Sequence, residues 1–301
     1  MTHDHLRPFG RLLTAMVTPF APDGSLDADG AAKLAAYLVD EQKNDALVIS
    51  GTGGESPTTT DAEKETLIRV VVEAVGDRAK VVAGVGTNST AHTVECARTA
   101  EKAGAHGLLV VTPYYNKPPQ AGLVRHFTAV ADATGLPILL YDIPHRSGIP
   151  IDTETLVRVA DHPNIVGVKD AKGDLAASSD VMRRTDLAYY SGEDAATLPM
   201  LSVGAVGVVG TSTHFIGAPT LQLIEAYERG DVAGALALHQ RLLPLFTGIF
   251  RTQGTILVKA GLRAQGRPAG PVRSPLVDAT EAEMNQLRED AAAAGLVLVT
   301  N

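Results

Sequence analysis

Short apolar runs alternate with longer amphipathic stretches along most of the chain. Eight apolar runs recur at intervals of roughly 20 to 30 residues, with the length and composition of buried strands. They span residues 12–17, 46–49, 80–85, 107–111, 138–141, 165–169, 187–190 and 207–209. Stretches with helical spacing lie between them, at about 27–42, 61–75, 90–103, 120–134, 152–161, 175–185 and 195–203. This alternation predicts parallel βαβ units throughout.

Eight such units in 301 residues suit a closed (β/α)8 TIM barrel with an extension. An open doubly wound sheet is the competing architecture, but the chain has no G-x-G-x-x-G fingerprint after a strand and no G-x-x-x-x-G-K-[ST] loop. The pattern is wholly helical from about Gly217. We therefore predict an α/β fold with a catalytic barrel over 1–216 and a C-terminal helical extension over 217–301. Capping boxes at Thr60–Glu63 and Thr280–Glu283 predict two helix starts.

Charge and hydropathy narrow the classes of partner and location. The formal net charge is −8 and no basic run occurs, so nucleic acid is not an expected partner. The apolar run at 12–17 does not resemble a signal peptide. Residues 195–224 lack charged side chains, but prolines and glycines interrupt them, which favours buried helix, strand and loop over a membrane span. A cytoplasmic protein is the expectation.

The only cysteine, Cys96, lies in a helical stretch, so no internal disulfide is possible. We expect a buried structural thiol at this position. The nine histidines show no H-E-x-x-H or other ligand spacing. A catalytic metal is therefore not expected.

The strand at 165–169 ends in an ionisable amine, Lys169, where a turn residue is more usual. Because side chains alternate along a strand, Lys169 shares a face with Gly167 and points away from Asp170. Gly167 would leave room for a small molecule beside the lysine. Burial disfavours the ammonium form, and a neutral amine can attack a carbonyl to form a Schiff base. The alternative is a lysine that extends from the strand end into water.

Other polar groups follow the strands at the end where barrel enzymes carry their sites. Tyr141 would lie one strand spacing from Lys169, about 4.8 Å, and could relay protons with Thr52 and a second phenol. It could equally be a core tyrosine. Arg146 suits bidentate capture of a carboxylate, although a solvated surface charge is its simpler reading. Glycines 51, 53 and 54 indicate a tight turn, which would also let a carboxylate approach backbone N–H groups.

Three stretches together resemble the dihydrodipicolinate synthase and N-acetylneuraminate lyase family of class I, Schiff-base aldolases. They are Gly51 to Glu55, Pro113 to Pro118 and Gly167 to Ala171, and the likeness covers essentially the whole chain. The resemblance implies no external cofactor and a homo-oligomer, commonly a dimer of dimers. Its implied catalytic residues are Lys169 as the pyruvate Schiff-base lysine, Tyr141, Thr52, and Tyr115 lent across a dimer interface. Its implied substrate-binding residues are Thr52, Gly53, Arg146, Gly192 and Val209.

The resemblance implies condensation of pyruvate with L-aspartate 4-semialdehyde, as in lysine and diaminopimelate biosynthesis, because synthases place an arginine at the position of Arg146. Two departures keep alternatives open. Threonine is usual at Gly53, and Ser-Val is usual at Gly210-Thr211. The alternatives are a lyase or dehydratase of 2-keto-3-deoxy acids and a non-catalytic barrel that binds a keto acid. Gly53 also predicts weak pyruvate binding, which Gly53→Thr would strengthen.

Some synthases of this family are inhibited by lysine bound at the dimer interface. The residues here that resemble that pocket are Ser56, Pro57, Asp61, Lys64, Asn88, His92 and Tyr114. Lysine-sensitive members tend to have a glutamate where this chain has His92. The sequence therefore predicts an enzyme that lysine does not inhibit.

Overall fold

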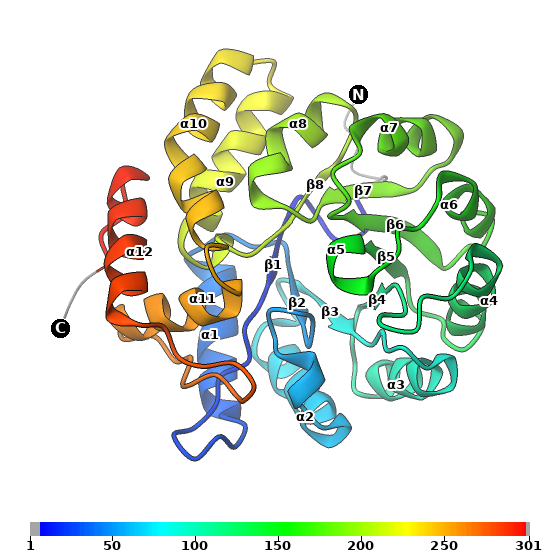
Figure 1. The fold of residues 1–301 in the computed structure, drawn as a ribbon, viewed down its shortest axis with the longest axis horizontal. Coiled ribbons are helices and arrows are strands. Elements are labelled where there is room, and N and C mark those ends of the chain that lie inside the picture. The colour runs from blue at the N-terminus through cyan, green and yellow to red at the C-terminus, as the bar shows by residue number, and fades with distance from the viewer. Residues whose placement is uncertain (1–6, 299–301) are drawn as a thin grey trace.

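A computed structural model describes residues 7–298 and contains a closed barrel of eight parallel strands (Figure 1). The strands are β1 Leu12–Ala15, β2 Ala46–Ile49, β3 Lys80–Gly84, β4 Gly107–Val111, β5 Ile138–Asp142, β6 Ile165–Asp170, β7 Ala188–Ser191 and β8 Gly207–Gly210. They pair in chain order, and β8 pairs with β1 to close the ring. The predicted barrel is confirmed, and the open sheet is excluded.

Helices surround the barrel and continue beyond it. They are α1 Ala28–Asp40, α2 Asp61–Val75, α3 Thr90–Lys102, α4 Gln120–Ala131, α5 Pro144–Ser147, α6 Thr153–Val159, α7 Leu175–Arg184, α8 Thr197–Ser202, α9 Thr213–Glu228, α10 Val232–Gly248, α11 Gly254–Ala264 and α12 Glu281–Ala293. Two short 3-10 turns are η2 Ser56–Thr58 and η3 Asp194–Ala196. Both capping boxes are present, at the starts of α2 and α12. The predicted helix at 195–203 is divided between η3 and α8.

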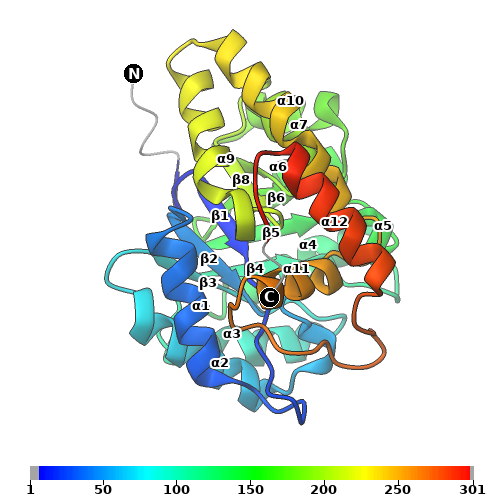
Figure 2. The ribbon, with the colours of Figure 1, turned by 90° about the vertical axis from the view of Figure 1, so that its left-hand side faces the viewer.

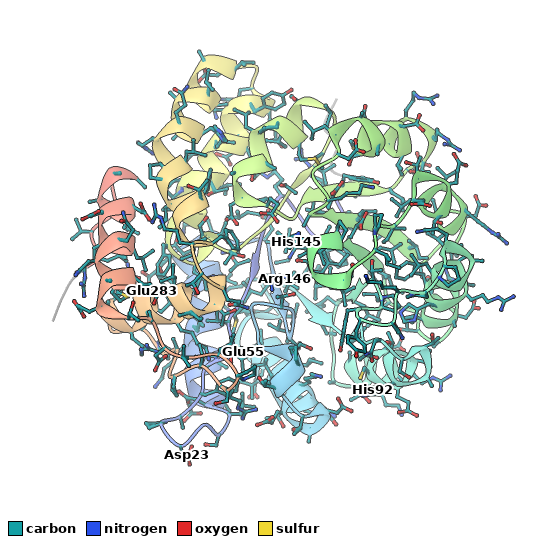
Figure 3. All side chains as sticks on the ribbon, in the orientation of Figure 1. Asp23, Glu55, His92, His145, Arg146 and Glu283 are labelled. Atoms are coloured by element: carbon teal, nitrogen blue, oxygen red, sulfur yellow. The ribbon has the colours of Figure 1, made fainter. Side chains whose placement is uncertain are left out.

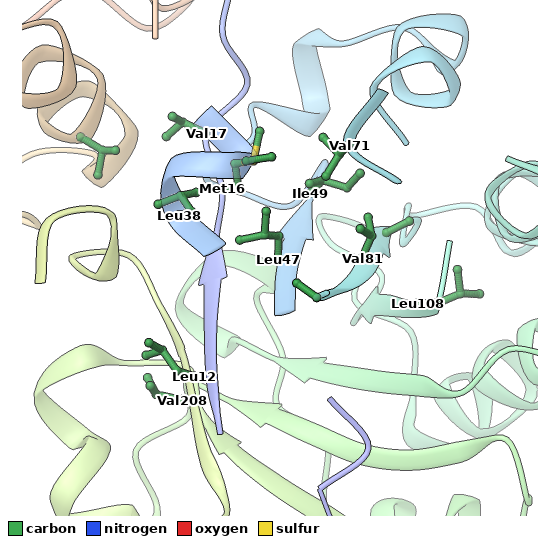
Figure 4. Close-up of a cluster of buried hydrophobic side chains, with 14 of the residues drawn as sticks. Leu12, Met16, Val17, Leu38, Leu47, Ile49, Val71, Val81, Leu108 and Val208 are labelled. Atoms are coloured by element: carbon green, nitrogen blue, oxygen red, sulfur yellow. The ribbon is translucent and has the colours of Figure 1, made fainter. Parts of the chain in front are cut away.

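Two apolar layers result from the alternation of side chains along the strands. One fills the barrel interior and includes Leu13, Leu139 and Tyr141. The other lies between the strands and the helices, where Leu47, Val81 and their neighbours are drawn in Figure 4. Both layers are needed because parallel strands in a barrel are covered on both faces.

The C-terminal helices pack on one another beside the barrel. Figure 2 shows α12 alongside α10, and α10 also packs against α9. Backbone angles at Ile216 are not helical, so α9 is bent next to the predicted boundary at 216/217. The division into two domains stays a prediction. Residues 195–224 form η3, α8, β8 and part of α9, as predicted, and no described helix is long and apolar enough to cross a membrane.

A buried ion pair joins the C-terminal region to the loop after β2. Lys259 of α11 is fully buried, and its Nζ lies 2.5 Å from Oε1 of Glu55 and donates to the Pro271 carbonyl at 2.8 Å. The other oxygen of Glu55 accepts from the backbone N–H of Arg273 at 2.8 Å. Burial lowers the pKa of Lys259 to about 8, although the Glu55 carboxylate acts in the opposite direction. These contacts of Lys259, Pro271 and Arg273 link the C-terminal region to the Gly51–Glu55 loop.

Candidate functional site

The Lys169 side chain borders a cavity of about 400 Å³ at the C-terminal ends of the strands. Only 5% of Lys169 is exposed. The walls come from strand ends, from the loop after β2, and from the segment after α10 together with the first turn of α11. The lining residues are Ala15, Thr52, Gly53, Tyr141, Ile143, His145, Arg146, Lys169, Gly192, Glu193, Thr211, Phe250, Thr252, Gln253, Gly254 and Thr255. Lys169 therefore lies in an enclosed site, and the alternative of a lysine extending into water is wrong.

Tyr141 is the direct neighbour of Lys169, as predicted. The two residues are paired in the register of β5 and β6, and the Lys169 amine lies 4.1 Å from the centre of the Tyr141 ring. An aromatic face at this distance attracts an ammonium group. Asp170 points the other way and accepts hydrogen bonds from the Ser178 hydroxyl and the Lys172 N–H. The amine and the adjacent carboxylate therefore lie on opposite faces of β6.

The expectation that Gly167 leaves room for a ligand is wrong. A β-carbon added at Gly167 would lie 2.3 Å from the Ala188 carbonyl oxygen and 2.9 Å from a methyl group of Leu139. The space is already filled by β7 and β5. Glycine is needed here because neighbouring strands approach closely, and the ligand space lies higher, at the level of Lys169.

A second cavity, of about 420 Å³, shares four lining residues with the first, namely Thr52, Tyr141, Ile143 and Arg146. Thr52 and Tyr141 thus lie on the boundary between the two spaces. Tyr115 lines only the second cavity, is 88% exposed and has a positive φ of 75°. A left-handed conformation is uncommon for a bulky residue and is typical of functional sites. The structure therefore places Thr52 and Tyr141 at the cavity that contains Lys169, whereas Tyr115 lies only at the second cavity.

Arg146 lies on α5, over the strand ends, where it lines both cavities (Figure 3). Its side chain is exposed and forms no ion pair with any carboxylate among residues 7–298. An unpaired guanidinium at a cavity mouth is suited to binding a substrate carboxylate in bidentate fashion. The four-residue helix that carries it was not predicted from the sequence.

Two acidic residues near Lys169 were missed by the sequence analysis. Glu193 lines the lysine cavity, and burial raises its pKa while Lys169 and Arg146 act in the opposite direction. Asp194 is fully buried, and burial raises its pKa too. Its carboxylate accepts from the N–H groups of Thr211 and Ser212 at 3.0 Å and from the Ser212 hydroxyl at 2.5 Å. Asp194 thereby holds the loops after β7 and β8 together.

The unusual Gly210 fits this arrangement. A β-carbon there would lie 2.9 Å from Asp194 Oδ1 and 2.6 Å from a methyl group of Thr213, so a serine would need its neighbours to move. Gly192 lines the cavity as predicted, whereas Val209 is fully buried in the barrel interior and is not among the cavity-lining residues. Thr213 and Asp194 therefore occupy the space that the usual serine side chain would need at position 210.

Residues 250–255 form a wall of the cavity that the sequence did not indicate. Phe250, Thr252, Gln253, Gly254 and Thr255 all line it. The Thr255 hydroxyl donates to the Gly53 carbonyl at 3.1 Å, which links this segment to the loop after β2. The helical C-terminal region is therefore part of the site.

The structure changes the expectation for Gly53→Thr. A β-carbon at Gly53 would lie 2.9 Å from the Ala15 carbonyl oxygen, which belongs to β1 and cannot rotate away. We expect both Gly53→Ala and Gly53→Thr to lose about 1–3 kcal/mol of stability, as overpacked sites do, without a lower KM for pyruvate. Urea unfolding and initial rates check this. Alanine is the matched control because it adds the β-carbon without the hydroxyl. A tenfold lower KM for threonine alone would show that the loop can move aside.

The single cysteine is only half-buried, so the prediction of a buried thiol is wrong. Burial and the nearby Asp61 carboxylate nevertheless raise the pKa of Cys96 to about 11. A thiol in that state is a weak nucleophile at neutral pH.

Comparisons with known proteins identify the family of this chain. Residues 8–294 match the model of the dihydrodipicolinate synthetase family. A 4-hydroxy-tetrahydrodipicolinate synthase of Acidothermus cellulolyticus is 70% identical, covering 96% of this chain and 93% of that protein. The 4-hydroxy-tetrahydrodipicolinate synthase 2 of Streptomyces coelicolor is 62% identical, covering 97% of each chain.

A crystal structure of DHDPS from Cyanidioschyzon merolae with lysine bound superimposes on this chain with a TM-score of 0.94. It is 44% identical and covers 96% of this chain and 99% of that one. With the barrel, the buried lysine and sequence matches over nearly the full length, the chain belongs to the dihydrodipicolinate synthetase family.

Proposed function

We propose that this chain condenses pyruvate with L-aspartate 4-semialdehyde, towards 4-hydroxytetrahydrodipicolinate, through a Schiff base on Lys169. The observation that carries the proposal is a buried lysine amine beside Tyr141 in a cavity with an unpaired arginine at its mouth. The family membership makes the chain a lyase of the class I aldolase type. The reaction needs no external cofactor because the lysine itself supplies the covalent intermediate.

The chemistry follows from what each group can do. The Lys169 amine attacks the ketone carbon of pyruvate, and loss of water gives an imine. Removal of a methyl proton gives an enamine, whose carbon attacks the aldehyde. Thr52, Tyr141 and Tyr115 carry protons in these steps, and Arg146 holds the carboxylate of the aldehyde substrate. Hydrolysis or transimination then releases the lysine.

The rival substrates are distinguished by one experiment. Purified protein is incubated in parallel mixtures that each contain pyruvate and one aldehyde, either L-aspartate 4-semialdehyde or an aldehyde without a carboxylate. Pyruvate consumption is measured in each mixture. The proposal expects clear preference for the semialdehyde and loss of that preference in Arg146→Met. Cleavage of 2-keto-3-deoxy acids without synthase activity would favour the lyase alternative, and no reaction of any aldehyde would favour the non-catalytic barrel.

Tyr115 leads to a proposal about assembly. The residue is 88% exposed in the single chain, yet its backbone is held in an uncommon conformation. We propose that a second copy of the chain covers it and that the tyrosine completes the neighbour's site, in a homo-oligomer that we expect to be a dimer of dimers. Sedimentation of the wild type and of Tyr115→Ser tests the assembly, and kcat of the variant tests the shared site.

Insensitivity to lysine is a further expectation. His92 Nε2 lies 2.8 Å from Asp61 Oδ2, and Lys64 Nζ lies 3.6 Å from Asp61 Oδ1. The Asp61 carboxylate is thus already paired with two groups, and Lys64 would repel the ammonium of an incoming lysine. Initial rates at sub-saturating pyruvate should show half-inhibition only above about 1 mM L-lysine. Half-inhibition well below that would refute the expectation, and His92→Glu is the variant expected to gain sensitivity.

A further inference from the structure

Three potential metal ligands of different types meet where α2 begins beside α3. Asp61 is the first residue of α2, and His92 and Cys96 are one turn apart on α3. Their ligand atoms all lie within 4.8 Å of one another. His92 Nε2 is 2.8 Å from Asp61 Oδ2, and Cys96 Sγ is 3.9 Å from Asp61 Oδ1. Figure 3 shows His92 at the outer edge of the molecule, away from Arg146 and the barrel mouth.

The geometry points to a zinc site formed by Asp61, His92 and Cys96, which we propose as a second binding site of this protein. Residues at i and i+4 on a helix present their side chains on one face, which is the spacing that helical zinc sites use. A carboxylate, an imidazole and a thiolate are all zinc ligands. None of the three residues lines either cavity at the barrel mouth, so the site is separate from Lys169. Asp61 and His92 are also among the residues that resemble the lysine-inhibition pocket of the family, so zinc would occupy part of that pocket.

The observed separations are close to those that zinc requires. Zinc bonds of about 2.0 Å to nitrogen and oxygen and about 2.3 Å to sulfur place tetrahedral ligands about 3.3 Å apart for N···O and about 3.5 Å for S···O. His92 Nε2 lies 2.8 Å from one Asp61 oxygen, Cys96 Sγ lies 3.9 Å from the other, and one ligand atom from each of the three residues lies within 4.8 Å of the other two. The three side chains must rotate to bring one ligand atom each around a single point, which they can do because Asp61 is exposed and His92 and Cys96 are half-buried. The same exposure leaves a fourth position for water.

The choice of metal follows from the ligand set. A thiolate and an imidazole favour zinc and related transition metals, whereas magnesium and calcium prefer sites made of oxygen atoms. The thiol must lose its proton on binding, and a dication beside it favours that loss. Lys64 opposes binding, since its amine lies 3.6 Å from Asp61 Oδ1 and would be close to the metal. Replacing Lys64 with an uncharged residue should therefore tighten zinc binding, which gives a test of the site.

A bound zinc ion would join the start of α2 to α3. The Gly51–Glu55 loop leads through η2 into α2, so the metal would fasten the end of the segment that carries Thr52. We expect zinc to raise the melting temperature of the full chain by several degrees, because a ligand that binds only the folded state stabilises it.

The test uses cobalt as a spectroscopic probe and zinc for affinity. Full-length protein is titrated with Co²⁺, and thiolate-to-cobalt charge-transfer absorption in the near ultraviolet is recorded. Zinc affinity is measured in competition with a chromophoric chelator. We expect the charge-transfer band in the wild type and its absence in Cys96→Ser. Zinc affinity should fall at least tenfold in Cys96→Ser and His92→Asn and rise severalfold in Lys64→Met.

The matched control is His162→Asn. His162 also contacts a carboxylate, with Nε2 3.2 Å from Asp132 Oδ1, but the residues described around this pair place no third ligand with it. Its zinc affinity should stay within twofold of the wild type. Circular dichroism without metal confirms that each variant is folded, and misfolding cannot produce the gain expected for Lys64→Met. A band that persists in Cys96→Ser, or zinc affinity unchanged in both Cys96→Ser and Lys64→Met, would overturn the proposal.

Discussion

Lys169→Ala is expected to lower kcat by roughly a thousandfold or more, the scale on which enzymes lose activity when a covalent nucleophile is removed. No other described lysine lines the cavity, so no second amine can replace it. Lys169→Arg should be equally inactive, because a guanidinium stays protonated and cannot form the imine. Initial rates at saturating pyruvate and semialdehyde measure the loss.

Reductive trapping identifies the amine directly. Pyruvate with borohydride should attach a reduced pyruvyl group to Lys169 and inactivate the wild type, because borohydride fixes an imine. Peptide mass spectrometry locates the label. Lys259 is the internal control, since burial lowers its pKa to about 8 and yet its amine is held by Glu55 and the Pro271 carbonyl. Label on Lys259, or none on Lys169, would count against the Schiff base.

Breaking the Glu55–Lys259 pair is the second large effect that we expect. Lys259→Met leaves the Glu55 carboxylate without its partner in the interior, and Glu55→Gln leaves the Lys259 ammonium in the same condition. Removal of one member of a buried pair costs about 3–5 kcal/mol, largely because the other charge remains desolvated. Urea unfolding of each single variant should show losses of this size, with an unchanged slope against denaturant concentration.

The double variant separates this explanation from simple loss of packing. Glu55→Gln with Lys259→Met leaves no buried charge, so its loss should be clearly smaller than the sum of the two single losses. Additive losses would mean that the two residues act independently. Arg69→Met is a matched control, because Arg69 pairs with Glu65 on the exposed side of α2 and should change stability by less than about 1 kcal/mol.

Much of the fold could be predicted because it depends on local patterns. The eight apolar runs form the eight strands, and alternation along β5 and β6 is enough to predict that Tyr141 lies next to Lys169. The prediction from side-chain alternation failed where the packing of neighbouring strands determines the space around a residue. Gly167 was interpreted as open space, but the Ala188 carbonyl occupies it, and no feature of residues 165–169 reports how closely β7 approaches.

The candidate site was predicted where a residue ends a strand and missed where it does not. Thr52, Tyr141, Arg146 and Lys169 follow strands and were found. Residues 250–255 lead into and begin α11, far along the chain, and their place in the cavity wall depends on how the C-terminal helices pack. The three ligands of the proposed zinc site were missed for another reason. His92 and Cys96 lie one turn apart on α3, but Asp61 comes from another helix, and only the packing of α2 on α3 brings it to them.

The Thr255 hydrogen bond to Gly53 has a consequence for the chain as it is synthesised. All eight strands have been made once Gly210 has been added, but Thr255 follows 45 residues later, since 255 minus 210 is 45. At translation rates of about 5–20 residues per second, a nascent chain spends about 2–9 s with every barrel strand made and the cavity open on one side. The Lys169 amine, which we propose reacts with keto acids, is thus enclosed only when the ribosome has nearly finished, so a truncated product would carry the lysine without the wall formed by the C-terminal helices.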